Sequence, residues 1–160
     1  MSGRDRAGGS PAHDRLAALG LNLPPVVTPL AAYLPAIQTG DLVYVSGQVP
    51  MVDGMLLATG KVGAEVPPER AAELARQCAL NALAAVDALV GIDRVVKVVK
   101  VLGFVASADG FTGQPAVING ASELFGAVFG EAGRHARSAV GVNQLPLDAP
   151  VEVEAIFEIS

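Results

Sequence analysis

Two residue types that bind and activate small molecules occur near the C-terminal end of the sequence. Arg137 opens a valine-containing segment, and Glu154 lies on the polar side of the segment that follows. Arginine stays protonated at any working pH, and its planar guanidinium group fits a carboxylate through two hydrogen bonds. A glutamate carboxylate beside a bound ligand can hold a water molecule for attack. The two residues therefore form either a ligand site or a structural ion pair at an interface, and both interpretations stay open on this evidence.

Other familiar catalytic arrangements are absent from the sequence. Gly60 and Gly63 lack the spacing and the lysine of a phosphate-binding loop. His13 and His135 are far apart and have no cysteine beside them, which argues against a zinc site. Ser46 lacks the flanking glycine and the strand-to-helix turn of a nucleophile elbow. We therefore expect no metal and no cofactor.

The composition favours a protein that forms subunit contacts and does not bind nucleic acid. Of the 160 residues, 51% are hydrophobic and only 17% are charged, whereas an ordinary domain carries about 25% charged residues. The net charge is −5, and the 11 lysine and arginine residues are spread along the chain. Nucleic-acid binding needs clustered cations to displace phosphate counterions, so nucleic acid is an unfavoured partner.

The sequence also bears on cellular location. Cys78 is the only cysteine, so no disulfide can form within the chain and an oxidising compartment is not needed. No apolar run approaches the roughly 20 residues of a membrane span, and the N-terminus lacks the apolar core of a secretion signal. We therefore expect a cytoplasmic protein that does not associate with membranes.

Residues 1–29 are expected to form an N-terminal extension. Residues 1–9 have the composition of a disordered lead-in. Ser10 followed by Pro11 is typical of a helix start, and Gly20 would end this short helix. The prolines that come next favour an extended connector.

Residues 30–160 predict a single domain of the α+β class. Strand-like patterns begin at Tyr33 and continue through 42–48. Asp53-Gly54 between apolar runs indicates a hairpin, so we expect the domain to open with a β-meander. The later elements are a helix at 69–90, a strand at 94–106, a helix around 117–129, and strands at 137–143 and 151–159.

This order of elements predicts a mixed sheet with two helices packed on one face. The strand at 94–106 is rich in valine and apolar on both of its faces, so both must be covered. Helices cover only one face in the predicted fold. A neighbouring subunit is the economical cover for the other.

Three segments resemble the signature segments of the reactive-intermediate deaminase (RidA, YjgF-like) family. They are LVYVSGQVP at 42–50, ARSAVGV at 136–142 and LPLDAPVEVEAI at 145–156. The resemblance covers residues 30–160 with the order and spacing of the elements preserved. It implies a chorismate-mutase-like α+β fold and a homotrimer whose sites lie in clefts between subunits.

The resemblance also implies roles for individual residues. Arg137 matches the arginine that grips the substrate carboxylate, and Glu154 matches the acid that positions the hydrolytic water. Ser122 stands where deaminating members carry an asparagine, and the nearest asparagine, Asn119, lies one helical turn earlier. The positions that the resemblance places in the substrate-binding pocket are Tyr33, Ser46, Gly47, Ser122 and Ala139.

These observations lead to one main functional hypothesis and one alternative. The main hypothesis is hydrolytic deamination of small 2-imino and enamine acids to 2-keto acids and ammonia, with a small carboxylate-bearing substrate. The alternative is a non-catalytic trimer that binds a small carboxylate or keto acid as a sensor or scaffold, because the same arginine would serve both. Ribonuclease activity, sometimes attributed to relatives, is disfavoured by the acidic balance of the chain.

Overall fold

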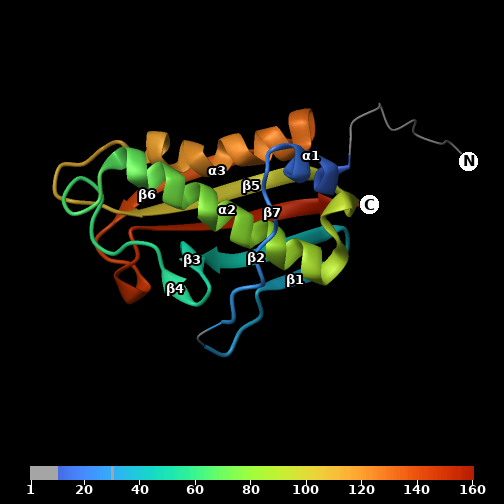
Figure 1. The fold of residues 1–160 in the computed structure, drawn as a ribbon, viewed down its shortest axis with the longest axis horizontal. Coiled ribbons are helices and arrows are strands. Elements are labelled where there is room, and N and C mark those ends of the chain that lie inside the picture. Colours follow the sequence, from blue (N-terminus) through green and yellow to red (C-terminus); the bar gives the residue numbers. More distant parts are fainter. Residues whose placement is uncertain (1–10, 30) are drawn as a thin grey trace, which may run out of the picture.

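The centre of the molecule is a five-stranded mixed sheet, seen in a computed structural model that describes residues 11–29 and 31–160 (Figure 1). Only β5 and β6 run parallel, and the other neighbouring strands are antiparallel. In spatial order the strands are β1 (Ala36–Thr39), β2 (Leu42–Gln48), β7 (Val151–Ile159), β5 (Val95–Ala106) and β6 (Ala136–Val142).

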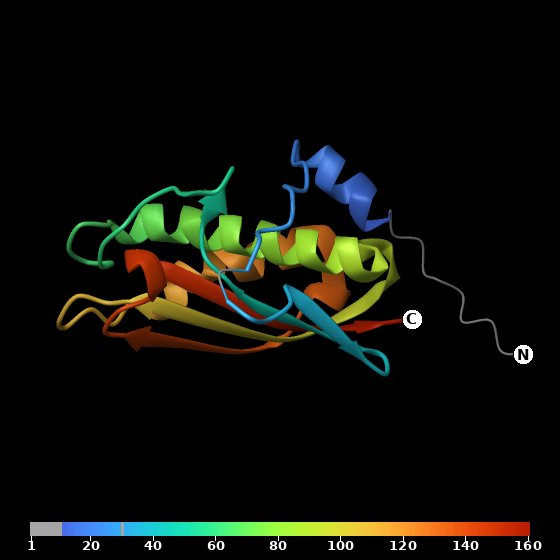
Figure 2. The same ribbon diagram turned by 90° about the horizontal axis from the view of Figure 1, so that it is seen from below.

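Two helices, α2 (Pro68–Val90) and α3 (Gln114–Phe129), cover one face of this sheet, as the view in Figure 2 shows. The alanines of α2 let the two helices lie close together. At Gly120 of α3 a side chain would collide with the backbone of Ala72, so only glycine fits this crossing. The expected α+β fold with two helices on one sheet face is confirmed.

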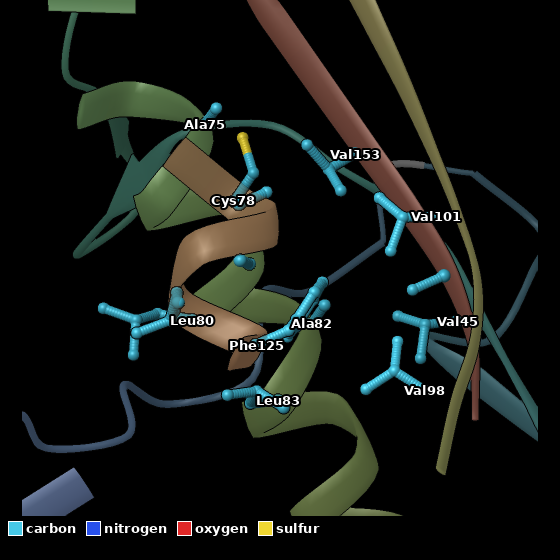
Figure 3. Packing of buried hydrophobic residues seen from close by; sticks show 14 of the residues in the cluster. Val45, Ala75, Cys78, Leu80, Ala82, Leu83, Val98, Val101, Phe125 and Val153 are labelled. Carbon is cyan, nitrogen blue, oxygen red and sulfur yellow. The ribbon is translucent and has the colours of Figure 1, made fainter. Parts of the chain in front are cut away.

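The core lies between the helices and the sheet (Figure 3). Alternate residues of β7 point into it, and Val151, Val153 and Phe157 are fully buried. Cys78 on α2 is buried as well, and its burial raises the pKa of the thiol well above the ordinary range. The cysteine is therefore a packing residue of the core.

The opening of the domain differs from the predicted β-meander. Asp53 and Gly54 do form a hairpin turn with positive φ angles of 52° and 77°, between β3 (Met51–Val52) and β4 (Met55–Leu56). These strands make a separate two-stranded sheet, and β2 pairs with β1 and β7.

The side chain of Asn81 on α2 explains this departure. Its Nδ2 donates hydrogen bonds to the carbonyl oxygens of Val49 (3.1 Å) and Met51 (3.0 Å). Backbone groups that a meander would pair with β2 are thus bound to a helix, and the chain turns away from the main sheet. The prediction failed because a long-range side-chain contact outweighed the local strand pattern.

The second face of the sheet is left uncovered by the described residues. Ile37, Tyr44 and Val140 are 57%, 41% and 43% exposed, and the side chains of Glu152, Glu154 and Glu158 share this face with them because they alternate with the buried residues of β7. Coverage of this face by another subunit remains a prediction.

The N-terminal helix α1 (Ala12–Ala18) packs at the far end of α3. The buried side chain of Leu16 points into the main core, and Arg15 donates a hydrogen bond to the carbonyl oxygen of Val128 (3.2 Å). Gly20 follows the helix with a φ of 72°, as expected. Residues 1–9 and Ser10, the expected lead-in and cap, lie outside the described residues. None of the described helices is long and apolar enough to cross a bilayer.

His13 fastens α1 to two aspartates, which makes this contact sensitive to pH. Its imidazole lies 3.0 Å from a carboxylate oxygen of Asp87 and 3.0 Å from one of Asp93. The hydrogen bond with Asp93 is the largest cause of a raised pKa of His13, against an opposing effect of burial. The stabilising contribution is therefore complete below the ordinary histidine pKa of about 6.5, and it is lost as the pH rises through the raised pKa.

We expect hydrogen exchange of the backbone amides in residues 11–23 to lose protection between about pH 6 and about pH 9, after correction for the intrinsic rate. His13→Ala should show the low protection at both pH values, while α2 stays protected. Protection that is equal at both pH values in the wild type would mean that Leu16 alone holds the helix.

Candidate active site

Arg137 lies on the edge strand β6, and its side chain turns toward α3. The strand register places it beside Val101, a fully buried residue of the helix-covered face. Its Nη1 donates hydrogen bonds to Asn119 Oδ1 (2.7 Å) and Ser122 Oγ (3.2 Å), and its Nη2 donates to the carbonyl oxygen of Pro115 (3.4 Å). All three partners are uncharged, and none of the ion pairs among the described residues involves Arg137. The guanidinium charge therefore remains available to an anion.

His135 also supports this arrangement. Its Nε2 lies 2.9 Å from Ser122 Oγ, and its Nδ1 lies 2.7 Å from the carbonyl oxygen of Gly133. The carbonyl can only accept, so Nδ1 carries a proton. Because Ser122 Oγ accepts from Arg137, its own proton is free to donate to Nε2. His135 thus fixes Ser122, which in turn orients Arg137.

The spacing of these residues contains a signal that could have revealed the cluster. His135 immediately precedes β6 and Arg137 lies two positions further on, the spacing at which side chains of an extended chain point to the same side. The two residues of α3 that meet them, Asn119 and Ser122, are three positions apart and share a helix face. The rings of His135 and Phe125 also pack nearly perpendicular to each other, at 89°, with ring centroids 6.1 Å apart.

A second group of polar residues lies around Gly47, at a bulge in β2. The pairing of β2 with β7 shifts between Val45 and Gln48, and bulges often occur next to active sites. A Cβ atom at Gly47 would overlap the carboxylate of Glu152. Only glycine therefore lets this carboxylate lie against the backbone of β2.

A cavity of about 90 Å³ opens beside this contact. Tyr33, Gly47 and Glu152 all line it, so the structure brings two of the expected pocket residues together with a glutamate that the sequence analysis did not select. Burial raises the pKa of Glu152, and the nearby negative charge of Glu154 raises it further. A carboxylate with a raised pKa is a stronger base, as proton transfer requires.

Glu154 occupies a different environment. It lines a separate hollow of about 190 Å³ on the uncovered sheet face, together with Tyr44, Lys100 and Leu102. Arg137 faces the helices, so the two residues selected from the sequence lie on opposite faces of the sheet and do not meet within one chain. No ion pair joins Arg137 and Glu154 among the described residues of one chain, and a pair formed across a subunit interface stays a prediction.

The remaining expected site residues have supporting positions. Ser46 Oγ donates a hydrogen bond of 2.6 Å to the carbonyl oxygen of Leu34, and the Ser46 amide donates to Pro35 (2.9 Å). These bonds hold the segment that carries Tyr33 against β2. Ala139 pairs with Gly103 in the sheet and packs at the margin of the main core. It lines none of the cavities described above.

The two polar groups lie toward opposite sides of the sheet. The arginine group is on the edge strand β6, whereas the Gly47 group lies where β2 meets β7, two strands away. The first group holds an arginine without an acidic partner among the described residues, and the second holds a partly buried glutamate. No group of three or more histidine, cysteine or acidic side chains among residues 11–29 and 31–160 is arranged to hold a metal ion.

The mixed sheet backed by two helices is the fold of a small α+β protein of the RidA type. The chain belongs to this family, because a family model described as Endoribonuclease L-PSP matches residues 25–159. The match begins after α1, so this helix lies outside the matched region.

Individual relatives agree with this assignment. The chain is 44% identical to the Trypanosoma cruzi protein TCP17 over 147 residues, which cover 91% of this chain and 92% of that protein. It is 34% identical to a 2-iminobutanoate/2-iminopropanoate deaminase of Dermatophagoides farinae over 140 residues, which cover 87% and 94%. The crystal structure of Atu1372, a protein of unknown function from Agrobacterium tumefaciens, has a TM-score of 0.87 at 46% identity and covers 93% and 92%.

Proposed function

We propose that this protein hydrolyses small 2-imino acids, and the enamines in equilibrium with them, to 2-keto acids and ammonia. The observation that carries the proposal is the Arg137 guanidinium, which is held by three neutral oxygen atoms and has no ion-pair partner among the described residues. A carboxylate is the anion that its planar geometry fits best in a small substrate. A relative named for the deamination of such imino acids supports this substrate class.

In the proposed reaction, Arg137 binds the substrate carboxylate and thereby places the imine carbon. Glu152 removes a proton from a water molecule as the water oxygen bonds to that carbon. Glu152 returns that proton to the nitrogen. As the carbon–nitrogen bond breaks, Glu152 accepts the proton of the new hydroxyl group, so that ammonia leaves and the carbonyl forms. An iminium carbon is already electrophilic, so positioning and a base suffice for this step.

We assign the base to Glu152 in place of Glu154, the residue selected from the sequence. Glu152 lines one cavity with Tyr33 and Gly47, and its pKa is raised by burial. Glu154 lies two residues further along β7 in a hollow that contains none of the expected pocket residues. The shared cavity supports the choice of Glu152.

We further propose that the two polar groups are half-sites that meet between chains of a homotrimer. A contact that joins the β6 edge of one chain to the β2 side of the next uses different surfaces on the two partners, and such contacts form a ring when the rotation between neighbours closes. A ring would also cover the sheet face that the described residues leave open. Each site would then take Arg137 from one chain and Glu152 from its neighbour.

A coupled assay tests the activity. An amino-acid oxidase or a pyridoxal-phosphate dehydratase generates 2-imino acids, and keto-acid release is timed with and without the protein. We expect the wild type to accelerate release and Arg137→Ala to lose the acceleration, because the carboxylate is no longer held. The matched control is Arg134→Ala, since Arg134 is a highly exposed arginine three residues earlier.

The result separates the two functional hypotheses. Unchanged release by a folded wild-type trimer would reject the imine hydrolase. If the same protein still bound 2-keto acids through Arg137, it would be the non-catalytic carboxylate-binding trimer.

A further inference from the structure

Polar and apolar residues both line the cavity beside Glu152. Thr28, Tyr33 and Gln48 are polar lining residues besides Glu152. Most of the apolar lining residues come from three separate parts of the chain. They are Val27 and Pro29 of the N-terminal connector, Val49 and Met51 at the β2–β3 turn, and Pro146 and Leu147 before β7.

The charges around the cavity exclude ionised substrate side chains. No lysine, arginine or histidine is among the described residues that line it, and Glu152 is the one acidic residue there. A second carboxylate would meet the charge of Glu152 without any cation to compensate it. A cationic side chain would pair with Glu152 and take it away from the water molecule. Gln48 is buried, with 5% of its surface exposed, and its Nε2 donates to the Ser46 carbonyl oxygen (3.1 Å).

Leu147 is held toward the cavity by an unfavourable backbone. Its φ of 62° and the φ of 60° at Asp148 place two successive non-glycine residues in the left-handed region, which L-residues rarely adopt. Strain of this kind persists at functional sites when surrounding contacts enforce it. Here the Asp148 amide donates to the Leu145 carbonyl oxygen (3.2 Å), and Gln144 Nε2 donates to Asp148 Oδ1 (2.6 Å).

The strained leucine does not serve the hydrophobic core. Leu147 is 50% exposed, so the turn does not use it to bury apolar surface on folding. A half-exposed leucine that lines a cavity can instead bury its surface when a ligand enters. Val27 and Pro29 are partly buried residues of the connector that follows α1, and they can also bury surface against a ligand in the cavity.

We propose that this cavity is the subsite for the substrate side chain, and that it selects uncharged aliphatic 2-imino acids, such as those derived from leucine or methionine, over the short alanine-derived and the acidic ones. This inference rests on the proposed function, because it takes Arg137 as the carboxylate anchor and Glu152 as the base. Leu147 is a specificity-determining residue, and Val27 and Pro29 of the N-terminal connector line the same subsite.

The test is a comparison of kcat/KM for imines generated from alanine, leucine, methionine and glutamate. We expect the wild type to prefer the leucine and methionine imines over the alanine imine by about tenfold or more, the scale of discrimination that a few methylene groups provide. Leu147→Ala should reduce the leucine-to-alanine ratio by about tenfold without a change in the melting temperature.

The matched control is Leu89→Ala, a leucine on α2 that is 45% exposed and does not line the cavity. This variant should keep the wild-type ratio. A wild type that favours the alanine or glutamate imine, or a Leu147→Ala ratio equal to that of the wild type, would overturn the subsite.

Failure of the proposed function gives a different result, namely no acceleration with any imine. In that case the subsite is tested by binding. Calorimetric titration with pyruvate, 4-methyl-2-oxopentanoate and 2-oxoglutarate should still show the highest affinity for the branched keto acid, 4-methyl-2-oxopentanoate. Leu147→Ala should remove this preference. Equal affinities for the three keto acids would overturn the inference independently of catalysis.

Discussion

Glu152→Gln is expected to lower kcat for imino-acid hydrolysis by at least about a hundredfold, the usual contribution of a positioned general base. The amide keeps the size of the side chain, and so the contact with Gly47, but it cannot accept the proton of water. Glu154→Gln, the matched variant on the same strand and face, should stay within a few-fold of the wild type. Parallel single-turnover measurements on the two variants decide between the glutamates. A large loss in Glu154→Gln alone would restore the assignment made from the sequence.

The same variant should change stability with pH in a defined direction. The pKa of Glu152 is raised in the folded protein, first by burial and then by Glu154. Its protonated form is therefore favoured by folding, and this contribution is complete below the ordinary glutamate pKa of about 4.3 and is lost as the pH rises through the raised pKa. The glutamine of Glu152→Gln does not titrate. The melting temperature of this variant minus that of the wild type should therefore be more positive at neutral pH than in acid. Activity falls while stability rises, as expected when a functional group is held at a cost to folding.

Two inactive variants, Arg137→Ala and Glu152→Gln, are expected to regain imine-hydrolysing activity when they are co-expressed. In the proposed ring, each site combines Arg137 of one chain with Glu152 of the next, so a trimer containing both Arg137→Ala and Glu152→Gln chains holds one intact site. Random assortment of equal amounts makes about three quarters of the trimers mixed, which leaves about one quarter of all sites active.

The measurement is the specific activity of mixed trimers purified through two different affinity tags. The control is the double variant Arg137→Ala/Glu152→Gln co-expressed with either single variant. In each of these mixtures one of the two groups is missing from every chain, so no ring can contain an intact site. Mixed trimers as inactive as their parents would show that the two half-sites do not meet between chains.

Local patterns were sufficient to predict most of the fold. The valines of β5, the uninterrupted helix α2 and the alternation of β7 each follow from the preferences of the residues in one segment. The meander was the error, because the pairing of β3 depends on Asn81, which lies 30 residues from Met51 in the sequence. Local propensity contains no information about such a contact.

The site could be predicted only in part for a related reason. Glu152 and Glu154 alternate with the same apolar residues and lie on the same face, so periodicity cannot distinguish between them. The bulge at Gly47 distinguishes them, since it brings the backbone of β2 against one carboxylate and not the other. Arg137 was identifiable by residue type, but its neutral surroundings depend on packing between β6 and α3.

The buried cysteine has a practical consequence. Cys78 has the only thiol group of the chain, and its side chain lies between α2 and the sheet with no exposed surface. A thiol in this position reacts with a disulfide reagent only when the helix separates from the strands beneath it. The rate at which Cys78 of the native chain reacts therefore reports how often the core opens, and no label has to be introduced.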